Sequence, residues 1–350
     1  MVVAQSMLNK QVMTGRVRLF ALLALAGVIG LAGGCADLKV AKSEQLIQKG
    51  DALMKDSDLQ SALAEFEAAS QLTPQLAVAH SRKGVVYRRM GDYEQAIDSF
   101  AEAVRLEPDS FFDTVNLAQL YHFTHRMFDA IEAYLHACDL KPDDFDANLN
   151  LGVCYQQVDD PVQAVERFQK AIAIDPDRVH AYVNLGVAYD RLKKYYEAID
   201  AYKKALERDS HQPLVMVNLA QTYINQERFK IAKKALKQAI VMDPSLAASH
   251  EAMGLCLFRM REYEEARNAY QKALAINPRL PKALTGLGCL EMFRAIDNVP
   301  NARRELAMEY WHRSLELDSN QPIVRRLIAK YKKPTKAPDA VLLGDAGSAD

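Results

Sequence analysis

Small and apolar residues recur along this chain with a regular period, between residues 42 and 321. Each of the first seven periods contains a Gly or Ala, an Ala twelve residues later, an aromatic residue or Leu four residues beyond, and a second Ala three residues further on. Spacings of three and four residues place side chains on one face of an α-helix. The pattern therefore predicts two helices per period, packed closely where the small residues lie.

The second helix of each period ends at a turn residue that shares the same spacing. These turn residues are Pro74, Pro108, Pro142, Pro176, Ser210, Pro244 and Pro278. Proline cannot continue a helix because it lacks the backbone N–H and its ring clashes with the preceding turn. A period of this length, about 34 residues, is typical of an array of helix-turn-helix repeats. Such arrays serve as surfaces that hold other proteins, so the period favours binding over catalysis.

The residues at these positions resemble those of the tetratricopeptide repeat (TPR) family. The small first position is occupied by Gly50, Gly84, Ala118, Gly152, Gly186, Ala220, Gly254 and Gly288, and the aromatic position by Phe66, Phe100, Tyr134, Phe168, Tyr202, Leu236 and Tyr270. The resemblance implies an all-α fold, a right-handed α-α superhelix of about eight helix-turn-helix repeats. We expect repeats near residues 43–76, 77–110, 111–144, 145–178, 179–212, 213–246, 247–280 and 281–321.

The eighth repeat and the C-terminus depart from the period. Pro278 and Ser319 are further apart than the turn residues of the earlier repeats, and we expect the extra residues to form a loop near Phe293 to Asn301. That loop could be an extension without a role or a contact loop on the binding face. A helix over residues 322–333 is expected to cap the last repeat. Residues 334–350 are mostly Pro, Ala, Gly and Asp, and we expect a disordered tail.

The N-terminus has the pattern of a secretory signal. Basic residues, including Arg16 and Arg18, precede an apolar run over residues 19–32, which is short for a membrane-spanning helix. Residues 31–35 read Leu-Ala-Gly-Gly-Cys, which resembles a bacterial lipoprotein signal. The resemblance implies a signal peptide over residues 1–34, a lipidated Cys35 as first mature residue, and a linker over residues 35–42. The alternative is an uncleaved signal anchor, and translation could start at Met1 or Met13.

The resemblance to a lipoprotein signal and the resemblance to the TPR family together predict a subcellular location. Two or three acyl chains on Cys35 would hold the protein stably on a membrane. Ala36 rather than Asp follows the cysteine, which by resemblance favours the outer membrane of a diderm bacterium, facing the periplasm. The chain is similar to bacterial outer-membrane TPR lipoproteins of the type IV pilus assembly (pilotin) and NlpI-like adaptor kind.

Composition and motifs do not indicate an enzyme. With 44 basic and 45 acidic residues the net charge is -1, so we expect no nucleic-acid partner. The chain has no phosphate-binding loop or hydrolase motif, and its His and Cys residues lack metal-ligand spacing. We therefore expect no cofactor, no metal and no small-molecule substrate. Disulfides between Cys138 and Cys154, or between Cys256 and Cys289, stay open as possibilities.

The first helices of the central repeats carry the predicted peptide-binding groove. In the TPR family these helices line the concave face. One position holds an amide ladder, and neighbouring positions hold aliphatic residues: Asn116, Asn150, Asn184 and Asn218, with Val115, Leu149, Val183, Val217, Val153 and Val187. An Asn amide can both donate to and accept from a peptide backbone. We expect these residues to hold a segment with aliphatic side chains, although Asn is also common at this position without such a ligand.

Two functional hypotheses follow. In the first, the chain is a membrane-anchored scaffold that holds a peptide of an envelope partner and assists assembly or localisation of an envelope complex. In the second, it is a low-selectivity periplasmic holding protein for secreted or unfolded segments, or part of a polysaccharide or protein export system. A cytoplasmic scaffold would require the N-terminus to stay intact. The residues do not identify the partner.

Overall fold

The computed structural model describes residues 37–296 and 301–331. Within these ranges the protein consists of helices and short turns, with no strand. A first helix over residues 37–55 is followed by sixteen others. They are α2 (Leu59–Leu72), α3 (Ala77–Met90), α4 (Tyr93–Leu106), α5 (Phe111–Phe123), α6 (Met127–Leu140), α7 (Phe145–Gln157), α8 (Pro161–Ile174), α9 (Val179–Arg191), α10 (Tyr195–Arg208), α11 (Pro213–Asn225), α12 (Phe229–Met242), α13 (Ala247–Arg259), α14 (Tyr263–Ile276), α15 (Pro281–Ile296), α16 (Asn301–Leu317) and α17 (Pro322–Tyr331).

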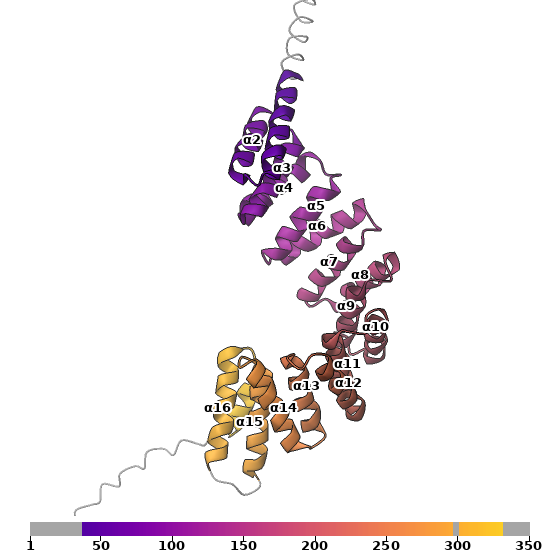
Figure 1. The fold of residues 1–350 in the computed structure, drawn as a ribbon, viewed down its shortest axis with the longest axis vertical. Helices are drawn as coiled ribbons and strands as arrows, with labels where there is room; N and C mark the ends of the chain where they lie inside the picture. Colours follow the sequence, from indigo (N-terminus) through magenta and orange to yellow (C-terminus); the bar gives the residue numbers. More distant parts are fainter. Residues whose placement is uncertain (1–36, 297–300, 332–350) are drawn as a thin grey trace, which may run out of the picture. The chain divides into compact units, whose positions relative to one another are not determined.

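Consecutive helices pack as pairs, which confirms the predicted all-α repeat solenoid (Figure 1). The helices group into two compact units. The first unit ends at Pro176 and contains the first helix through α8. The second begins at Asp177 and contains α9 through α17. In each unit the helices of one pair pack on each other and on the next pair, as α3 packs on α4 and α4 on α5.

Each helix pair is held together by the periodic small and aromatic residues. Phe66, Phe100 and Phe168 are fully buried, and each ring lies over the Gly of its own repeat. A Cβ atom placed on Gly152 would lie 2.5 Å from Cε1 of Phe168, which is closer than real Cβ atoms approach other heavy atoms. The predicted close approach of the two helices is therefore present, and the ring fills the space that a side chain on the Gly would take.

The turn inside each pair has a second periodicity of the same length, in the backbone. One residue per turn has a positive φ: Ser57, Gly91, His125, Asp159, Lys193, Glu227 and Arg261. Gly91, for example, ends α3, and the next N–H, of Asp92, donates to the carbonyl of Tyr87 at 2.9 Å. This left-handed cap satisfies carbonyls at the helix end and reverses the chain. Only Gly91 among these residues adopts the conformation without a steric cost.

The two ends of the repeat array differ from the sequence-based expectation. The first helix begins by residue 37, so residues 37–42, expected in a linker, are helical. The extra residues of the eighth repeat mainly lengthen its helices, because α15 has 16 residues and α16 has 17, where α13 has 13 and α14 has 14. The expected loop from Phe293 to Asn301 is therefore helical through Ile296 and again from Asn301. Cys35, the signal region and residues 332–350 lie outside the described residues.

Helix α17 closes the second unit. Its Val324 is buried with Met292, Ala307 and Trp311, and Tyr331 packs near Trp311 with ring centroids 6.1 Å apart. The helix therefore covers the apolar side of the last pair, as expected of the capping helix at residues 322–333. Of the described helices, none is sufficiently long and apolar to span a membrane.

Candidate peptide-binding groove

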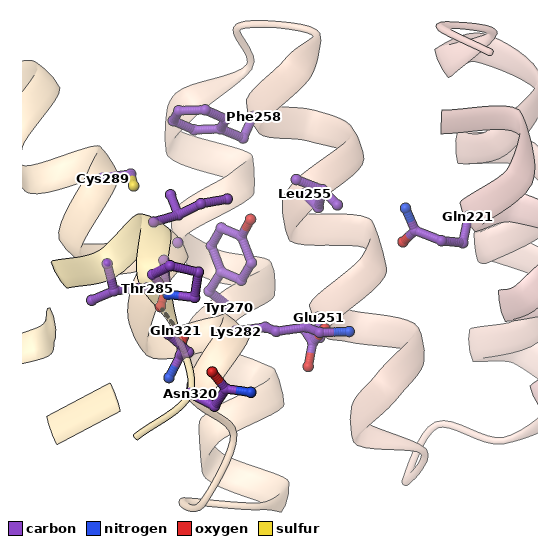
Figure 2. A pocket seen from close by; sticks show the side chains of 14 residues that line it. Gln221, Glu251, Leu255, Phe258, Tyr270, Lys282, Thr285, Cys289, Asn320 and Gln321 are labelled. Atoms are coloured by element: carbon purple, nitrogen blue, oxygen red, sulfur yellow. Dashed lines mark hydrogen bonds between the residues drawn. The ribbon is translucent and has the colours of Figure 1, made fainter. Parts of the chain in front are cut away.

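The second unit contains a groove with a volume of about 620 Å³. Its walls come from α11, α13 and α15, the first helices of three successive repeats, in which α13 contacts both α11 and α15. Tyr270 of α14 and the start of α17 complete the walls. Figure 2 shows Phe258, Leu255 and Glu251 along α13, with Gln221 of α11 facing them across the groove. A concave site of this volume is in the range of ordinary ligand pockets.

The lining is mainly apolar, and it uses positions that the period relates. Gln221, Leu255 and Cys289 are separated by one period each and share the position of Val153 and Val187. Glu251 and Thr285 share the position of Val217. Phe258, Tyr270 and Ile323 complete the apolar surface. The groove therefore lies at the positions expected to face a ligand, but in the last three repeats rather than in the central ones.

A hydrogen-bonded framework fixes the groove wall formed by α17. The Gln321 amide nitrogen donates to the Ser314 carbonyl at 2.9 Å, and the Thr285 hydroxyl donates to the Gln321 amide oxygen at 3.3 Å. The Trp311 ring nitrogen donates to the Thr285 carbonyl at 3.3 Å. These bonds join the ends of α15, α16 and α17. The position of Ile323 relative to α15 is therefore set by a satisfied polar network.

Two charged groups lie at one end of the groove. Burial raises the pKa of the Glu251 carboxyl, and the nearby Lys282 ammonium opposes that shift. The side chains of Glu251 and Lys282 lie side by side in Figure 2. Burial also raises the pKa of the Cys289 thiol and of the Tyr270 hydroxyl, so both stay protonated near neutral pH. A protonated thiol is a poor nucleophile.

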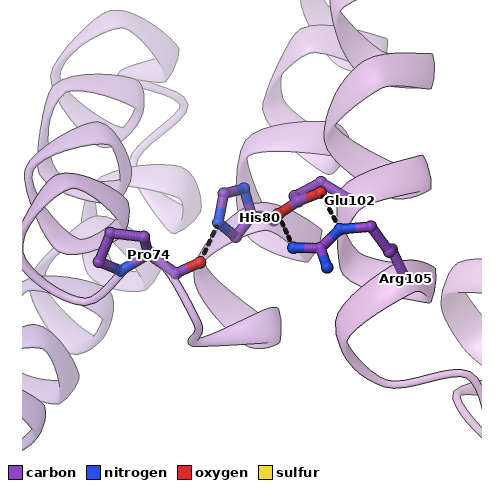
Figure 3. A network of polar contacts seen from close by, with 4 residues as sticks. All are labelled: Pro74, His80, Glu102 and Arg105. Carbon is purple, nitrogen blue, oxygen red and sulfur yellow. Dashed lines mark hydrogen bonds and ion pairs between the residues drawn. The ribbon is translucent and has the colours of Figure 1, made fainter.

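A recurring hydrogen bond sets where the helix that carries Glu251 begins. His250 Nε2 lies 3.1 Å from the carbonyl oxygen of Pro244, in the turn before α13. In the first unit His80 makes the same contact with Pro74 at 3.0 Å, beside an ion pair between Arg105 and Glu102 (Figure 3). Each bond joins a helix to the turn six residues earlier, so the turn proline fixes the start of the next repeat.

Asn116, the first member of the predicted amide ladder, has a different role from the one expected. It is only 5% exposed. Its Nδ2 donates to the Phe112 carbonyl at 2.7 Å, and its Oδ1 accepts from Arg88 of α3. Both polar atoms are used within the protein, so Asn116 joins α3 to α5 and does not present its amide to a ligand. The sequence does not reveal this because the partner, Arg88, belongs to the preceding repeat.

Asn150 lies in a second hollow, in the first unit. This hollow has a volume of about 630 Å³ and is lined by Gln119, Asn150 and Gln157 together with His122, Phe123, His125 and Tyr134. Gln157 of α7 contacts His122 of α5, with the two nitrogens 3.0 Å apart. The lining is more polar than that of the groove in the second unit, and Asn150 is half-buried.

The other predicted groove residues are distributed over both units. Asn184 and Asn218 lie half-buried on α9 and α11, which contact each other. The aliphatic residues Val115, Leu149, Val153, Val183 and Val187 are half-buried, whereas Val217 is buried. Val115 packs against the core between α5 and α7. None of the aliphatic six lines either hollow. Sequence reasoning missed Leu255, Phe258 and Ile323, although Leu255 continues the position of Val153 and Val187.

The described cysteines are free thiols. Cys138, Cys154 and Cys256 are buried and Cys289 is half-buried, so neither possible disulfide is formed. Burial raises the pKa of Cys154 to about 12 and that of Cys256 to about 11. Among the described residues, no group of three His, Cys, Asp or Glu side chains is placed to hold a metal ion.

Comparisons with known proteins agree with the repeat architecture. Sequence models described as tetratricopeptide repeat match residues 77–110, 143–211, 191–256 and 247–280. A search against curated protein sequences found no match.

Three solved structures have similar folds. A TPR protein fragment from Cytophaga hutchinsonii is 19% identical, with a TM-score of 0.57, and the match covers 69% of this chain and 99% of that one. A TPR protein from Parabacteroides merdae is 18% identical, with a TM-score of 0.52 and coverages of 79% and 99%. PilF from Pseudomonas aeruginosa is 21% identical, with a TM-score of 0.50 and coverages of 63% and 97%. At these identities the matches show the fold alone. The fold is typically a non-catalytic scaffold for protein–protein interaction, and this chain is a tetratricopeptide repeat protein.

Proposed function

We propose that this protein is a membrane-anchored scaffold that holds a peptide segment of an envelope partner in the groove of its second unit. The observation that carries the proposal is the apolar groove of about 620 Å³ lined by Leu255, Phe258, Tyr270 and Ile323. Its apolar floor suits aliphatic or aromatic side chains, and the polar groups at its ends can bond a peptide backbone. Asn218 of α11 stays part of the proposal as a further amide contact, and Asn150, in the hollow of the first unit, stays a separate prediction.

The groove supports a reversible interaction. Full burial of two aliphatic side chains contributes about 3–6 kcal/mol, and each backbone hydrogen bond contributes a net of about 0.5–1.5 kcal/mol. After the cost of association, such a contact has an affinity between about millimolar and micromolar. Holding a partner at a membrane raises its effective concentration, so a modest affinity is sufficient for a scaffold.

The anchor in this proposal is Cys35. Only Ala36 separates that residue from the first helix, which is helical by residue 37 and carries an exposed Leu38. An acylated Cys35 would therefore place the start of the repeat array directly at the membrane surface, without a long linker. By the resemblance of the signal, we place the protein at the outer membrane of a diderm bacterium, facing the periplasm.

Site-specific photo-crosslinking in cells tests the groove. A photoreactive phenylalanine analogue at position 323 is placed in the groove, where Ile323 is 68% exposed. The same analogue at position 241 is the matched control, because Val241 is 81% exposed on α12 and does not line the groove. We expect one saturable partner at position 323 and none at 241. Many substoichiometric clients would favour the low-selectivity holding role, and equal labelling at both positions would reject the groove.

Intact mass of the membrane-extracted protein, beside a Cys35→Ala variant, tests the anchor. We expect a mature chain that begins at an acylated Cys35, and a Cys35→Ala variant that lacks the added mass. An unmodified chain that retains the residues before Cys35 would contradict the envelope location, while leaving the groove experiment valid.

A further inference from the structure

We propose that the C-terminal segment of the same chain folds back and places Val341, Leu342 and Leu343 in the groove of the second unit. The segment would occupy the groove when no partner is bound and would have to leave before a partner enters. This inference uses the groove described above, but it does not depend on the anchor or on the envelope partner.

The groove has an open apolar edge that such a segment could cover. Ile323 is 68% exposed at the start of α17, although it lines the groove beside Leu255 and Cys289. Leu255 and Phe258 are only half-buried. Apolar side chains that stay this exposed in a concave surface favour an occupant.

The chain after α17 contains one apolar cluster. Residues 332–350 are Lys, Pro, Thr, Ala, Asp, Gly and Ser, except for Val341, Leu342 and Leu343. These three consecutive aliphatic residues are the kind of side chain that the groove accepts. A groove of about 620 Å³ has room for aliphatic side chains of this size next to a backbone segment.

The segment is long enough to reach the groove. Helix α17 has 10 residues, so its end at Tyr331 lies about 15 Å along the helix from its start at Pro322, beside the groove. Val341 follows Tyr331 by ten residues, which span up to about 33–36 Å when extended. The chain can therefore turn after Tyr331 and run back along α17 to Ile323 with slack to spare.

The charges of the two surfaces are complementary. Asp339 and Asp345 flank the aliphatic cluster. Lys282 lies in the groove beside the Glu251 carboxyl, and the exposed Arg326 lies one helical turn from Ile323. Acidic residues on both sides of the cluster would meet these two cations when the cluster is docked. Opposite charges at an exposed rim add little affinity but select the register of the docked segment.

Cys289 provides a built-in probe of the groove. It lines the groove and is half-buried, whereas Cys138, Cys154 and Cys256 are buried. A docked segment would shield Cys289 from a soluble alkylating reagent. The experiment measures the alkylation rate of Cys289 by peptide mass spectrometry in the purified full-length chain. The parent chain is compared with a Leu342→Ser, Leu343→Ser variant and with a matched Ala340→Ser, Ala346→Ser control.

We expect the Leu342→Ser, Leu343→Ser variant to be alkylated at Cys289 about tenfold faster than the parent, and the control to match the parent. A tenfold change corresponds to a docking free energy of about 1.4 kcal/mol. Ile323→Asp should give the same acceleration, and it should add nothing when combined with the two Ser substitutions. Ile323 is exposed, and unchanged slow labelling of the buried Cys154 verifies in every variant that the fold is intact.

Equal Cys289 rates in all chains would overturn the proposal. Protection that grows with protein concentration would also overturn it, because the shielding segment would then come from a second copy of the chain. The assay contains no partner, so its failure leaves the photo-crosslinking experiment and the proposed function untouched. Conversely, absence of a crosslinked partner does not affect the alkylation result.

Discussion

The packing of Phe168 over Gly152 predicts a compensating pair of substitutions. The sixth repeat already uses another solution at the same two positions, where Ala220 and Leu236 are both fully buried. We therefore expect Gly152→Ala and Phe168→Leu to be tolerated together better than the two single changes suggest. Gly152→Ala adds a methyl group at a position 2.5 Å from the Phe168 ring. Phe168→Leu removes the ring atoms that would overlap with that methyl group.

The magnitudes follow from two opposing costs. Phe168→Leu alone leaves a cavity in a fully buried site and should cost about 1–3 kcal/mol. Gly152→Ala alone overpacks the site by about 1–3 kcal/mol, while the better helix propensity of Ala returns about 1 kcal/mol. In the double variant the methyl group fills part of the cavity and the overlap is gone. We expect a coupling free energy of at least about 1 kcal/mol in favour of the double variant.

Hydrogen exchange measured by mass spectrometry is the suitable assay, because repeat arrays open locally and a single unfolding free energy is not well defined. Peptides from α7 and α8 report the opening free energy of the fourth repeat, and peptides from α15 and α16 serve as internal controls. If the costs of the two substitutions add to within about 0.5 kcal/mol, the ring and the small residue do not compete for one space. The packing argument would then be wrong.

Three further predictions concern other features of the repeats. Lys193→Gly and Glu227→Gly should each raise the opening free energy of their repeat by about 1 kcal/mol in hydrogen exchange, because both residues have positive φ. Gly91→Ala should lower the opening free energy of its repeat in the same assay. Burial raises the pKa of the Asp190 carboxyl, while hydrogen bonds from Thr222 and Tyr202 oppose that shift. The protonated carboxyl therefore contributes stability that is fully present below the unfolded pKa of about 3.9 and is lost as the pH rises through the folded pKa. The stability of the parent relative to Asp190→Asn should therefore fall as the pH rises above that unfolded pKa, and a pH-independent difference would contradict this. Asn116→Ala should destabilise α3 and α5 by about 1–3 kcal/mol, because it removes a buried acceptor of Arg88. Asn150→Ala should leave the stability nearly unchanged. Equal losses of protection against hydrogen exchange in the two variants would refute this difference.

The sequence was sufficient to predict the helix pairs because their determinants are local. Ala62, Phe66 and Ala69 lie on one helical face, and the same spacing returns in each repeat, so the period identifies both helices and the close contact between them. The turns inside the pairs were not predicted in the same detail. Their left-handed residues include His125, Asp159 and Lys193, which share a backbone conformation and no side-chain chemistry. These turn residues share a value of φ but not a residue type, so the sequence does not reveal that they are equivalent.

The site could be predicted only in part, because it depends on contacts between repeats. Asn116 and Asn150 occupy equivalent positions, but the residue one repeat earlier differs. Arg88 donates to Asn116, whereas His122, at the position of Arg88, contacts Gln157. The position of Val153 and Val187 is expected to face a ligand, and Leu255, at the same position in a later repeat, lines the groove. The period does not predict the wall of the groove that α17 forms, because the sequence predicts this helix only as a cap.

The relation between α17 and the repeats explains why the groove lies at this end. Ile323 follows Lys282 by the length of the eighth repeat, so α17 occupies the place of the first helix of a ninth repeat. The equivalent residues Phe112 and Leu214 are also exposed and apolar, which shows that this position points away from the helix pair. Val324 of the same helix is buried on Trp311. The helix therefore closes the core and also supplies a wall of the groove, which both Ile323 and Val324 line. Substitutions at the buried Val324 should therefore alter binding, because they displace that wall.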